Sequence, residues 1–285
     1  MSALSSHEND PTGQAMRAHP PLHDITIEDR TPATRVITIQ RPHVRNAYRS
    51  RTAQELAEAI TEFGINESLR SLIITGGDTA FCAGGDLKSA EEYSTGHNDQ
   101  LGHATVVRNG MHGAIRALQA CDKPTIAQIS GACTAGGLAL ALACDLRIAD
   151  TTATFGDPAS KVGLLPDEGG AWLFSRVMGA DQALLMMLTG ITYSATEAAN
   201  RGLVTSVVEP NELQSTVFAL CESIASTAPI TTRLLTRLVH SATDQTLDQA
   251  LQTAELACQI ANNTRDADEG LAAFKQHRVP EYEGK

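Results

Sequence analysis

Two glycine-rich loops, each behind an apolar run, are the first places in this sequence where backbone chemistry is expected. The first loop, 81–87 (FCAGGDL), comes after the apolar run 71–75. The second, 130–139 (SGACTAGGLA), comes after the apolar run 125–129. Adjacent glycines let a backbone approach a ligand closely, and a helix that begins at such a loop offers free N–H groups with partial positive charge. One N–H from each loop could together stabilise a developing oxyanion. Asp86 in the first loop is also able to cap a helix. Neither loop has the spacing of a nucleotide-binding fingerprint.

A third segment, 163–172 (GLLPDEGGAW), carries two adjacent carboxylates. One interpretation makes Asp167 the N-cap of a helix over 169–178, with Glu168 in the first turn, where its charge complements the helix dipole. The other interpretation makes Asp167 a general base, because apolar neighbours would desolvate its carboxylate. Those neighbours are Leu164, Leu165 and Trp172. The residues alone leave both interpretations open.

The composition limits what these segments could serve. The chain has 285 residues, 42% of them apolar and 19% charged, which predicts a globular protein with an extensive core. It carries 22 basic and 33 acidic residues, a net charge of -11, so nucleic acid is not an expected partner. An anionic ligand would have to be held by local features. Aromatic residues make up 4% of the chain, too few for base-stacking platforms.

Cysteine usage and hydropathy indicate a cytoplasmic protein. The six cysteines have no CxxC spacing, which predicts reduced packing thiols with neither a disulfide framework nor a metal site. They are Cys82, Cys121, Cys133, Cys144, Cys221 and Cys258. The N-terminal residues lack an apolar signal core, and the longest nearly apolar stretch, 132–144, is too short to span a bilayer. No membrane partner is expected.

Strand and helix patterns alternate along most of the chain. Residues 25–30 and 35–41 alternate β-branched with polar side chains, and 51–63 has an amphipathic helical pattern with Glu55 expected in solvent. Further strands are predicted at 71–77, 125–130, 146–150 and 153–156, with helices at 104–120 and after Gly131. This alternation predicts βαβ units and a mainly parallel α/β core.

The two ends of the chain differ from the middle. Residues 1–21 are polar and without periodicity, and we predict a flexible arm there. Residues 22–210 are predicted to form the α/β core. Residues 211–285 are predicted to form a helical oligomerisation region, with helices at 211–226, 230–242, 245–262 and 266–275.

Together these segments resemble the enoyl-CoA hydratase/isomerase, or crotonase, family over about 22–280. The resemblance rests on the three segments above, in this order and spacing, together with 41–47 (RPHVRNA), 123–127 (KPTIA), 143–149 (ACDLRIA), 188–190 (LTG), 202–204 (GLV) and 269–274 (EGLAAF). The motifs are closest to those of phenylacetate-pathway-type enoyl-CoA isomerases. The resemblance implies an α/β fold of the crotonase type, a spiral of ββα units with a C-terminal helical trimerisation region.

The resemblance also implies the ligand and the site. It implies an acyl-CoA thioester substrate, no other tightly bound cofactor, and a homotrimer or a dimer of trimers. The family's oxyanion hole falls on the N–H groups of Gly85 and Gly136. The loop residues expected to contact coenzyme A are Ala83, Gly84, Asp86 and Leu87. His277 and Arg278 lie where relatives place basic residues near the phosphates of coenzyme A.

Two departures from the family pattern favour one chemistry. Family hydratases use a glutamate at each of two positions that are Ala139 and Ala159 here, so water addition by two carboxylates is excluded. Asp167 remains, at the place where related isomerases use an aspartate to shuttle a proton. We therefore expect a double-bond isomerase in which an oxyanion hole holds the enolate. Glu168 is a candidate second proton carrier, and His112 a weaker candidate by its tunable imidazole.

Three alternatives stay open. Asp167 could act as a nucleophile or base in a hydrolase or dehalogenase, since Asp167 and His112 match positions of the family's chlorobenzoyl-CoA dehalogenase. An atypical hydratase could use unexpected residues. A non-catalytic member could keep the fold as a binding module, although such a module would not need Gly85, Gly136 and Asp167 together. The acyl chain is undetermined; segment 88–110 is expected to line its pocket.

Overall fold

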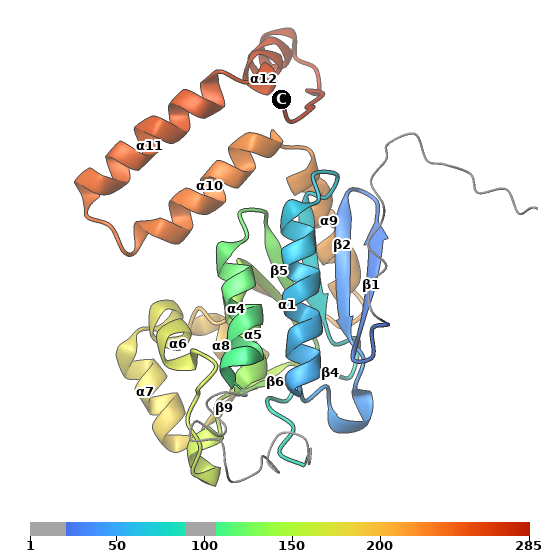
Figure 1. Cartoon of the computed structure of the whole chain (residues 1–285), viewed down its shortest axis with the longest axis vertical. Helices are drawn as coiled ribbons and strands as arrows, with labels where there is room; N and C mark the ends of the chain where they lie inside the picture. The colour runs from blue at the N-terminus through green and yellow to red at the C-terminus, as the bar shows by residue number, and fades with distance from the viewer. Residues whose placement is uncertain (1–20, 89–106) are drawn as a thin grey trace, which may run out of the picture.

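The computed structural model describes residues 21–88 and 107–285. The predicted arm at 1–21 lies almost wholly outside these residues, as does most of the predicted acyl-pocket segment at 88–110. In the described ranges the strands form two sheets (Figure 1). The larger sheet has the order β1 (Ile25–Arg30), β2 (Thr34–Ile39), β3 (Ser71–Thr75), β5 (Thr125–Ile129), β7 (Leu146–Asp150) and β10 (Ser206–Val208). The smaller sheet has the order β4 (Ala80–Cys82), β6 (Ala132–Thr134), β8 (Thr154–Gly156) and β9 (Thr192–Ser194).

The chain alternates between the sheets as it advances. A strand of the larger sheet is followed by a strand of the smaller sheet and then by helix, so β3, β5 and β7 are parallel neighbours, and β4, β6 and β8 are too. Strand β1 pairs antiparallel with β2, and β9 pairs antiparallel with β8. This repeat of two strands and a helix confirms the predicted crotonase-type spiral.

The helices cover the sheets and extend beyond them. They are α1 (Ser50–Ile65), α4 (Met111–Ala120), α5 (Gly136–Ala143), α6 (Gly170–Met178), α7 (Ala180–Thr189), α8 (Ala195–Asn200), α9 (Leu213–Ala225), α10 (Pro229–Ala242), α11 (Leu247–Asn262) and α12 (Arg265–Gln276), with short 3-10 helices at Pro42–Val44 and Ala159–Val162. The predicted amphipathic helix near 51–63 and the four predicted C-terminal helices are confirmed within a few residues. None of the described helices is long and apolar enough to cross a membrane.

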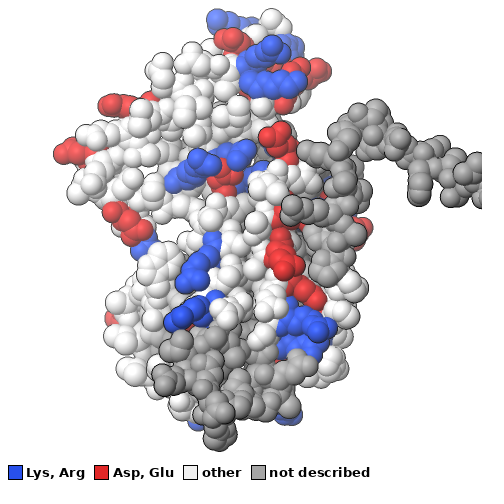
Figure 2. Space-filling view, viewed as in Figure 1, with Lys and Arg blue, Asp and Glu red and all other residues white. Residues whose placement is uncertain are grey.

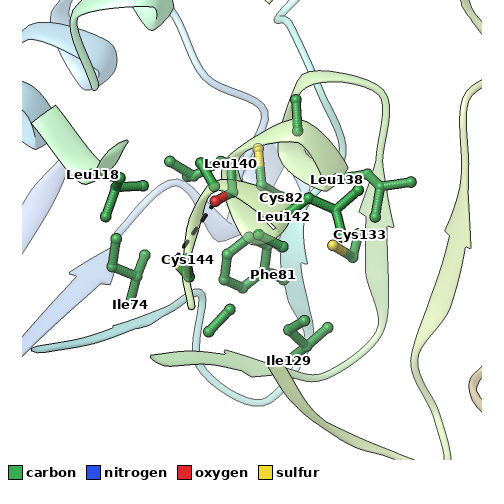
Figure 3. Packing of buried hydrophobic residues seen from close by; sticks show 14 of the residues in the cluster. Ile74, Phe81, Cys82, Leu118, Ile129, Cys133, Leu138, Leu140, Leu142 and Cys144 are labelled. Carbon is green, nitrogen blue, oxygen red and sulfur yellow. Dashed lines mark hydrogen bonds between the residues drawn. The ribbon is translucent and has the colours of Figure 1, made fainter. Parts of the chain in front are cut away.

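Helix α5 lies at the centre of the core. Every one of its residues is buried, as expected of a short helix that is apolar on all sides. Figure 3 shows its leucines beside the buried thiols of Cys82, Cys133 and Cys144, and the Cys144 thiol contacts the carbonyl oxygen of Leu140 at 3.6 Å. Burial raises the pKa of the Cys82 thiol to about 12, so this thiol is neutral at physiological pH. These cysteines pack; Cys258, by contrast, is exposed.

Helices α9 and α10 attach to the core in different ways. Helix α9 buries Leu213, Val217 and Cys221 against the larger sheet. Helix α10 has no buried residue and is held by charge: Arg233 donates to Asp122 at 2.8 and 3.1 Å, and the imidazole of His240 lies 2.5 Å from Asp145. The pair of α10 and α11 extends away from the sheets (Figure 1).

The His240–Asp145 contact predicts a pH-dependent stability. The hydrogen bond that the His240 imidazole donates to Asp145 raises the pKa of His240 above its ordinary value. Because the folded pKa is the higher one, the stabilisation is complete below the unfolded pKa of about 6.5 and is lost as pH rises through the folded pKa. Urea unfolding should show His240→Asn less stable than wild type by about 1.5 kcal/mol at pH 6 and by less at pH 9. His43→Asn, at an exposed site, is the control. A difference that grows with pH would contradict this assignment.

Candidate active site

The first glycine loop follows β4 and is fixed by contacts with the segment before α1. The Tyr48 N–H donates to Gly84 O at 2.9 Å, and the Asp86 N–H donates to Tyr48 O at 2.8 Å. Asp86 is buried, accepts from Arg41 Nη2 at 2.8 Å, and accepts from the Lys88 N–H at 3.2 Å. Asp86 therefore anchors the loop by an ion pair; most of the helix that it was expected to cap would lie beyond Lys88, outside the described residues.

Strand β6 lies inside the predicted loop segment 130–139, and its parallel pairing with β4 brings the glycines that follow the two strands together. Ala135 precedes α5 with φ 50°, a left-handed conformation that is strained for a residue with a side chain. A Cβ on Gly84 would lie 2.9 Å from the Cβ of Ala135, so the loops touch. Across the described residues, neither the Gly85 nor the Gly136 N–H donates a hydrogen bond. Gly85 lines the cavity described below, whereas Gly136 is buried at the start of α5, next to the lining residue Ala135.

The position of Gly136 has no room for a side chain. A Cβ at this position would lie 2.6 Å from Cε1 of Tyr48 and 2.7 Å from the carboxyl carbon of Glu168, closer than real Cβ atoms approach. The carboxyl group of Glu168 and the ring of Tyr48 therefore pack directly against the start of α5. This contact places a carboxylate beside one predicted oxyanion donor.

The third segment carries its two carboxylates in different environments. Asp167 is exposed, and it does not cap the following helix: the N-cap of α6 is Gly169, at φ 97°. The predicted capping role is therefore wrong, because the chain turns at Gly169 instead. Glu168 is only 6% exposed and accepts a hydrogen bond from the Tyr48 hydroxyl. Burial raises the pKa of Glu168 to about 7. The burial that was expected to desolvate the carboxylate of Asp167 is found instead at the carboxylate of Glu168.

A cavity of about 220 Å³ connects these groups. Its polar wall includes Gly85, Asp86, Asp167, Glu168 and the hydroxyl-bearing Tyr48. Its apolar wall includes Ala83, Leu87, Val107, Met111, Ala135, Pro158, Ala159, Val162, Leu164 and Leu165. An apolar pocket with a few convergent polar groups is typical of a small-molecule site. In the described part of the chain, no group of three or more His, Cys, Asp or Glu side chains is placed to hold a metal ion.

The remaining predicted residues lie in varied places. His112 Nε2 lies 2.7 Å from the backbone oxygen of Asp167, so this side chain contacts the carboxylate loop through its backbone. Ala159 lies on the cavity wall, whereas Ala139 is buried inside α5. Arg278 forms a bidentate pair with Glu269 at 2.5 and 2.7 Å beyond the end of α12. Figure 1 shows α12 at the end of the molecule opposite β4 and β6, and His277 directly follows it.

Tyr48 is the site residue that sequence reasoning missed. It follows Asn46-Ala47 in a motif used for the resemblance, yet no spacing signal relates it to Glu168, 120 positions further along the chain. A tyrosine between the predicted strand at 35–41 and the predicted amphipathic helix at 51–63 was the available signal.

The buried Arg41–Asp86 pair predicts a stability cost. Asp86→Asn leaves the Arg41 guanidinium without its nearest carboxylate, although Asp24 lies 3.7 Å from Arg41 Nε and limits the loss. We expect a decrease of about 2 kcal/mol in the free energy of unfolding, measured with urea. Glu28→Gln, which removes the exposed Glu28–Arg30 pair, should change it by less than about 0.5 kcal/mol. Equal effects of the two variants would show that burial of the Arg41–Asp86 pair is energetically unimportant.

The spiral of two sheets, the paired glycine loops and the carboxylate beside them define an acyl-thioester enzyme of the crotonase type. Residues 30–285 match the family model described as enoyl-CoA hydratase/isomerase. The chain belongs to the enoyl-CoA hydratase/isomerase family.

Relatives of both named activities resemble this chain. The short-chain-enoyl-CoA hydratase of Clostridium acetobutylicum is 32% identical over 258 residues, 90% of this chain and 96% of that protein. The 1,2-epoxyphenylacetyl-CoA isomerase of Escherichia coli is 32% identical over 249 residues, 87% of this chain and 94% of that protein. The crystal structure of an enoyl-CoA hydratase from Bacillus anthracis matches with a TM-score of 0.86 at 31% identity, over 92% of this chain and 100% of that one.

Proposed function

We propose that this protein is an enoyl-CoA isomerase, which shifts a C=C bond of an acyl-CoA thioester through an enolate. The observation that carries the proposal is the make-up of the cavity. Carboxylates of Asp167 and Glu168 lie with the Gly85 N–H on its wall, whereas the two positions at which family hydratases carry glutamates hold the methyl groups of Ala139 and Ala159. Proton transfer is therefore better supplied than addition of water.

In the proposed reaction, coenzyme A takes part only as a portion of the substrate. The Asp167 carboxylate takes a proton from one carbon of the enoyl chain, and the C–H electron pair moves through the C=C bond to the thioester oxygen. The N–H groups of Gly85 and Gly136 stabilise the negative charge on that oxygen. The proton returns to another carbon as the electron pair moves back, so the substrate and product have the same atoms.

We also propose that the C-terminal helices assemble a homotrimer or a dimer of trimers. Large apolar side chains on these helices are exposed in the single chain: Leu235, Val239, Leu247, Leu251, Leu256, Ile260, Leu271 and Phe274. In the view of Figure 2, most of the surface over α10 and α11 carries neither Lys or Arg nor Asp or Glu. An uncharged, apolar surface of this kind is suited to burial between subunits.

Product analysis separates isomerisation from its competitors. Purified protein is incubated separately with 3-enoyl-CoA and with 2-enoyl-CoA, and the products are resolved by liquid chromatography and mass spectrometry. The proposal expects the two enoyl-CoA isomers to interconvert with unchanged mass. Hydration of 2-enoyl-CoA with no turnover of 3-enoyl-CoA would support an atypical hydratase, for which Glu168 offers a buried carboxylate, and release of free coenzyme A would support a hydrolase. Either outcome without double-bond migration would overturn the isomerase proposal.

A further inference from the structure

Glu168 is a buried carboxylate that pairs with no Lys or Arg in the part of the chain that the structure describes. On the same cavity wall, Asp86 is buried too, but Arg41 neutralises it at 2.8 Å. The cavity wall also carries Lys161, but its ammonium group donates to Gly190 O at 2.7 Å. The described side chain that hydrogen-bonds to Glu168 is Tyr48, through its neutral hydroxyl. A buried carboxylate without a cation costs stability, so a fold that keeps one in a ligand cavity points to a function for it.

The position of Glu168 relates it to one end of the substrate. Its carboxyl group packs against Gly136, whose N–H is a proposed donor to the thioester oxygen. The carbon next to the thioester carbonyl, the α carbon, is one bond from the carbonyl carbon that carries this oxygen. A carboxyl group in contact with the proposed oxyanion donor is therefore placed for the α carbon. The exposed Asp167 lines the same cavity.

Tyr48 connects Glu168 to the first glycine loop. Its backbone N–H and carbonyl oxygen bind Gly84 and Asp86, on either side of Gly85, and its hydroxyl donates to Glu168 Oε1. The same residue therefore fixes the loop that carries one oxyanion donor and the carboxyl group that lies beside the other. Its backbone and side-chain contacts set the position of Glu168 relative to both donors.

We propose that Glu168 is a second proton carrier that serves the α carbon, with Tyr48 as the residue that positions it. This rests on the proposed isomerase function.

Ionised Asp167 takes a proton from the γ carbon of a 2-enoyl thioester, and the electron pair moves through the C=C bond to the thioester oxygen. As the pair returns, Glu168 gives its proton to the α carbon, and the C=C bond lies between the β and γ carbons. In reverse, ionised Glu168 takes the α proton and protonated Asp167 returns one to the γ carbon. Transfer of one proton from one carrier to the other, directly or through water, resets the site.

The surroundings of Glu168 keep both of its protonation states accessible. Burial raises the pKa of its carboxyl group most, and the negative charges of Asp167 and the buried Asp157 raise it further, while the Tyr48 hydrogen bond lowers it. The neutral thiol of Cys82 also faces it from β4. The resulting pKa of about 7 lets Glu168 donate or accept a proton near neutral pH.

Exchange at the α carbon tests Glu168 without any double bond. Butyryl-CoA, which is saturated, is incubated in D₂O, and α-deuterium is followed by proton NMR and mass spectrometry. We expect exchange by wild type, a loss of about 100-fold or more in Glu168→Gln, and retention of most exchange in Asp167→Asn. Glu58→Gln, at an exposed position of α1, is the matched control and should exchange like wild type.

The pH profile supplies a second readout that stays available if Glu168→Gln folds poorly. The wild-type exchange rate should rise with pH as Glu168 ionises. Tyr48→Phe removes a hydrogen bond that lowers the pKa of Glu168, so the midpoint of the profile should move to higher pH. A merely structural role of Tyr48 would reduce the rate without moving the midpoint, and that result would overturn its assignment.

The two proposals fail differently. Exchange by Glu168→Gln at the wild-type rate, or no exchange by wild type, would overturn the assignment of Glu168. Normal α exchange combined with no double-bond migration by wild type would overturn the isomerase proposal and leave Glu168 as the α-carbon base. Loss of α exchange in Asp167→Asn but not in Glu168→Gln would assign the α carbon to Asp167 instead.

Discussion

Replacing Gly136 by alanine is expected to lower kcat/KM for double-bond migration by about 100- to 1000-fold, the range seen when one oxyanion donor is lost. The added methyl group would lie 2.6 Å from the ring of Tyr48 and 2.7 Å from the carboxyl carbon of Glu168. These side chains must move, or the start of α5 must shift, and either change misaligns the N–H donor with the carboxyl group beside it. Initial rates with 3-enoyl-CoA measure the effect.

Gly113→Ala is the matched control for this substitution. Gly113 lies inside α4, and a Cβ there meets only the Cβ of Ala57, at an ordinary 3.5 Å. Alanine is the better helix former, so this variant should be as active as wild type and at least as stable. If Gly136→Ala kept wild-type activity, the oxyanion hole would have to be placed elsewhere.

Asp167→Asn is expected to reduce double-bond migration by about 1000-fold, because the amide can neither take a proton from carbon nor return one. The side chain is exposed, so the substitution should leave the free energy of unfolding nearly unchanged. The rate is measured with 3-enoyl-CoA under saturating conditions. Asp181→Asn, at an exposed position in the first turn of α7, changes the same charge outside the cavity and should retain wild-type activity. Comparable turnover by Asp167→Asn and wild type would remove Asp167 from the mechanism.

The features that sequence predicts well here depend on local patterns. An apolar run ending in glycines predicts a buried strand and a loop, and the parallel pairing of β4 with β6 then brings two such loops together. Amphipathic spacing predicts α1 and the C-terminal helices. Local patterns do not give the order of the strands in each sheet, because that order depends on contacts between residues distant in sequence. The spiral arrangement was therefore expected only from the family resemblance.

The features that sequence did not predict depend on packing over long separations. Asp167 and Glu168 are neighbours with the same charge, and only the turn at Gly169 and the contact with Tyr48 decide which of them is buried. Glu55 is a second case. Its place on the polar face of α1 predicted exposure, yet it is buried and accepts from the backbone N–H groups of His23 and Asp24 at 3.0 and 2.9 Å.

The negative net charge of the chain is consistent with the proposed way of binding the substrate. Free N–H groups at two glycine loops would stabilise the thioester oxygen without a cationic side chain. A chain with a net charge of -11 can therefore bind an anionic substrate, because only a few basic residues are needed to contact the phosphates. In the view of Figure 2, both basic and acidic side chains are present on the surface.

Deuterium incorporation during the conversion of 3-enoyl-CoA in D₂O tests the central claim most directly. Proton NMR of the product should show 2-enoyl-CoA, with deuterium at the α or γ carbon from protons that exchanged on the carboxyl groups, and Asp167→Asn should form almost none. A wild-type enzyme that leaves 3-enoyl-CoA unchanged while it hydrates 2-enoyl-CoA to a 3-hydroxyacyl-CoA would contradict isomerisation through an enolate.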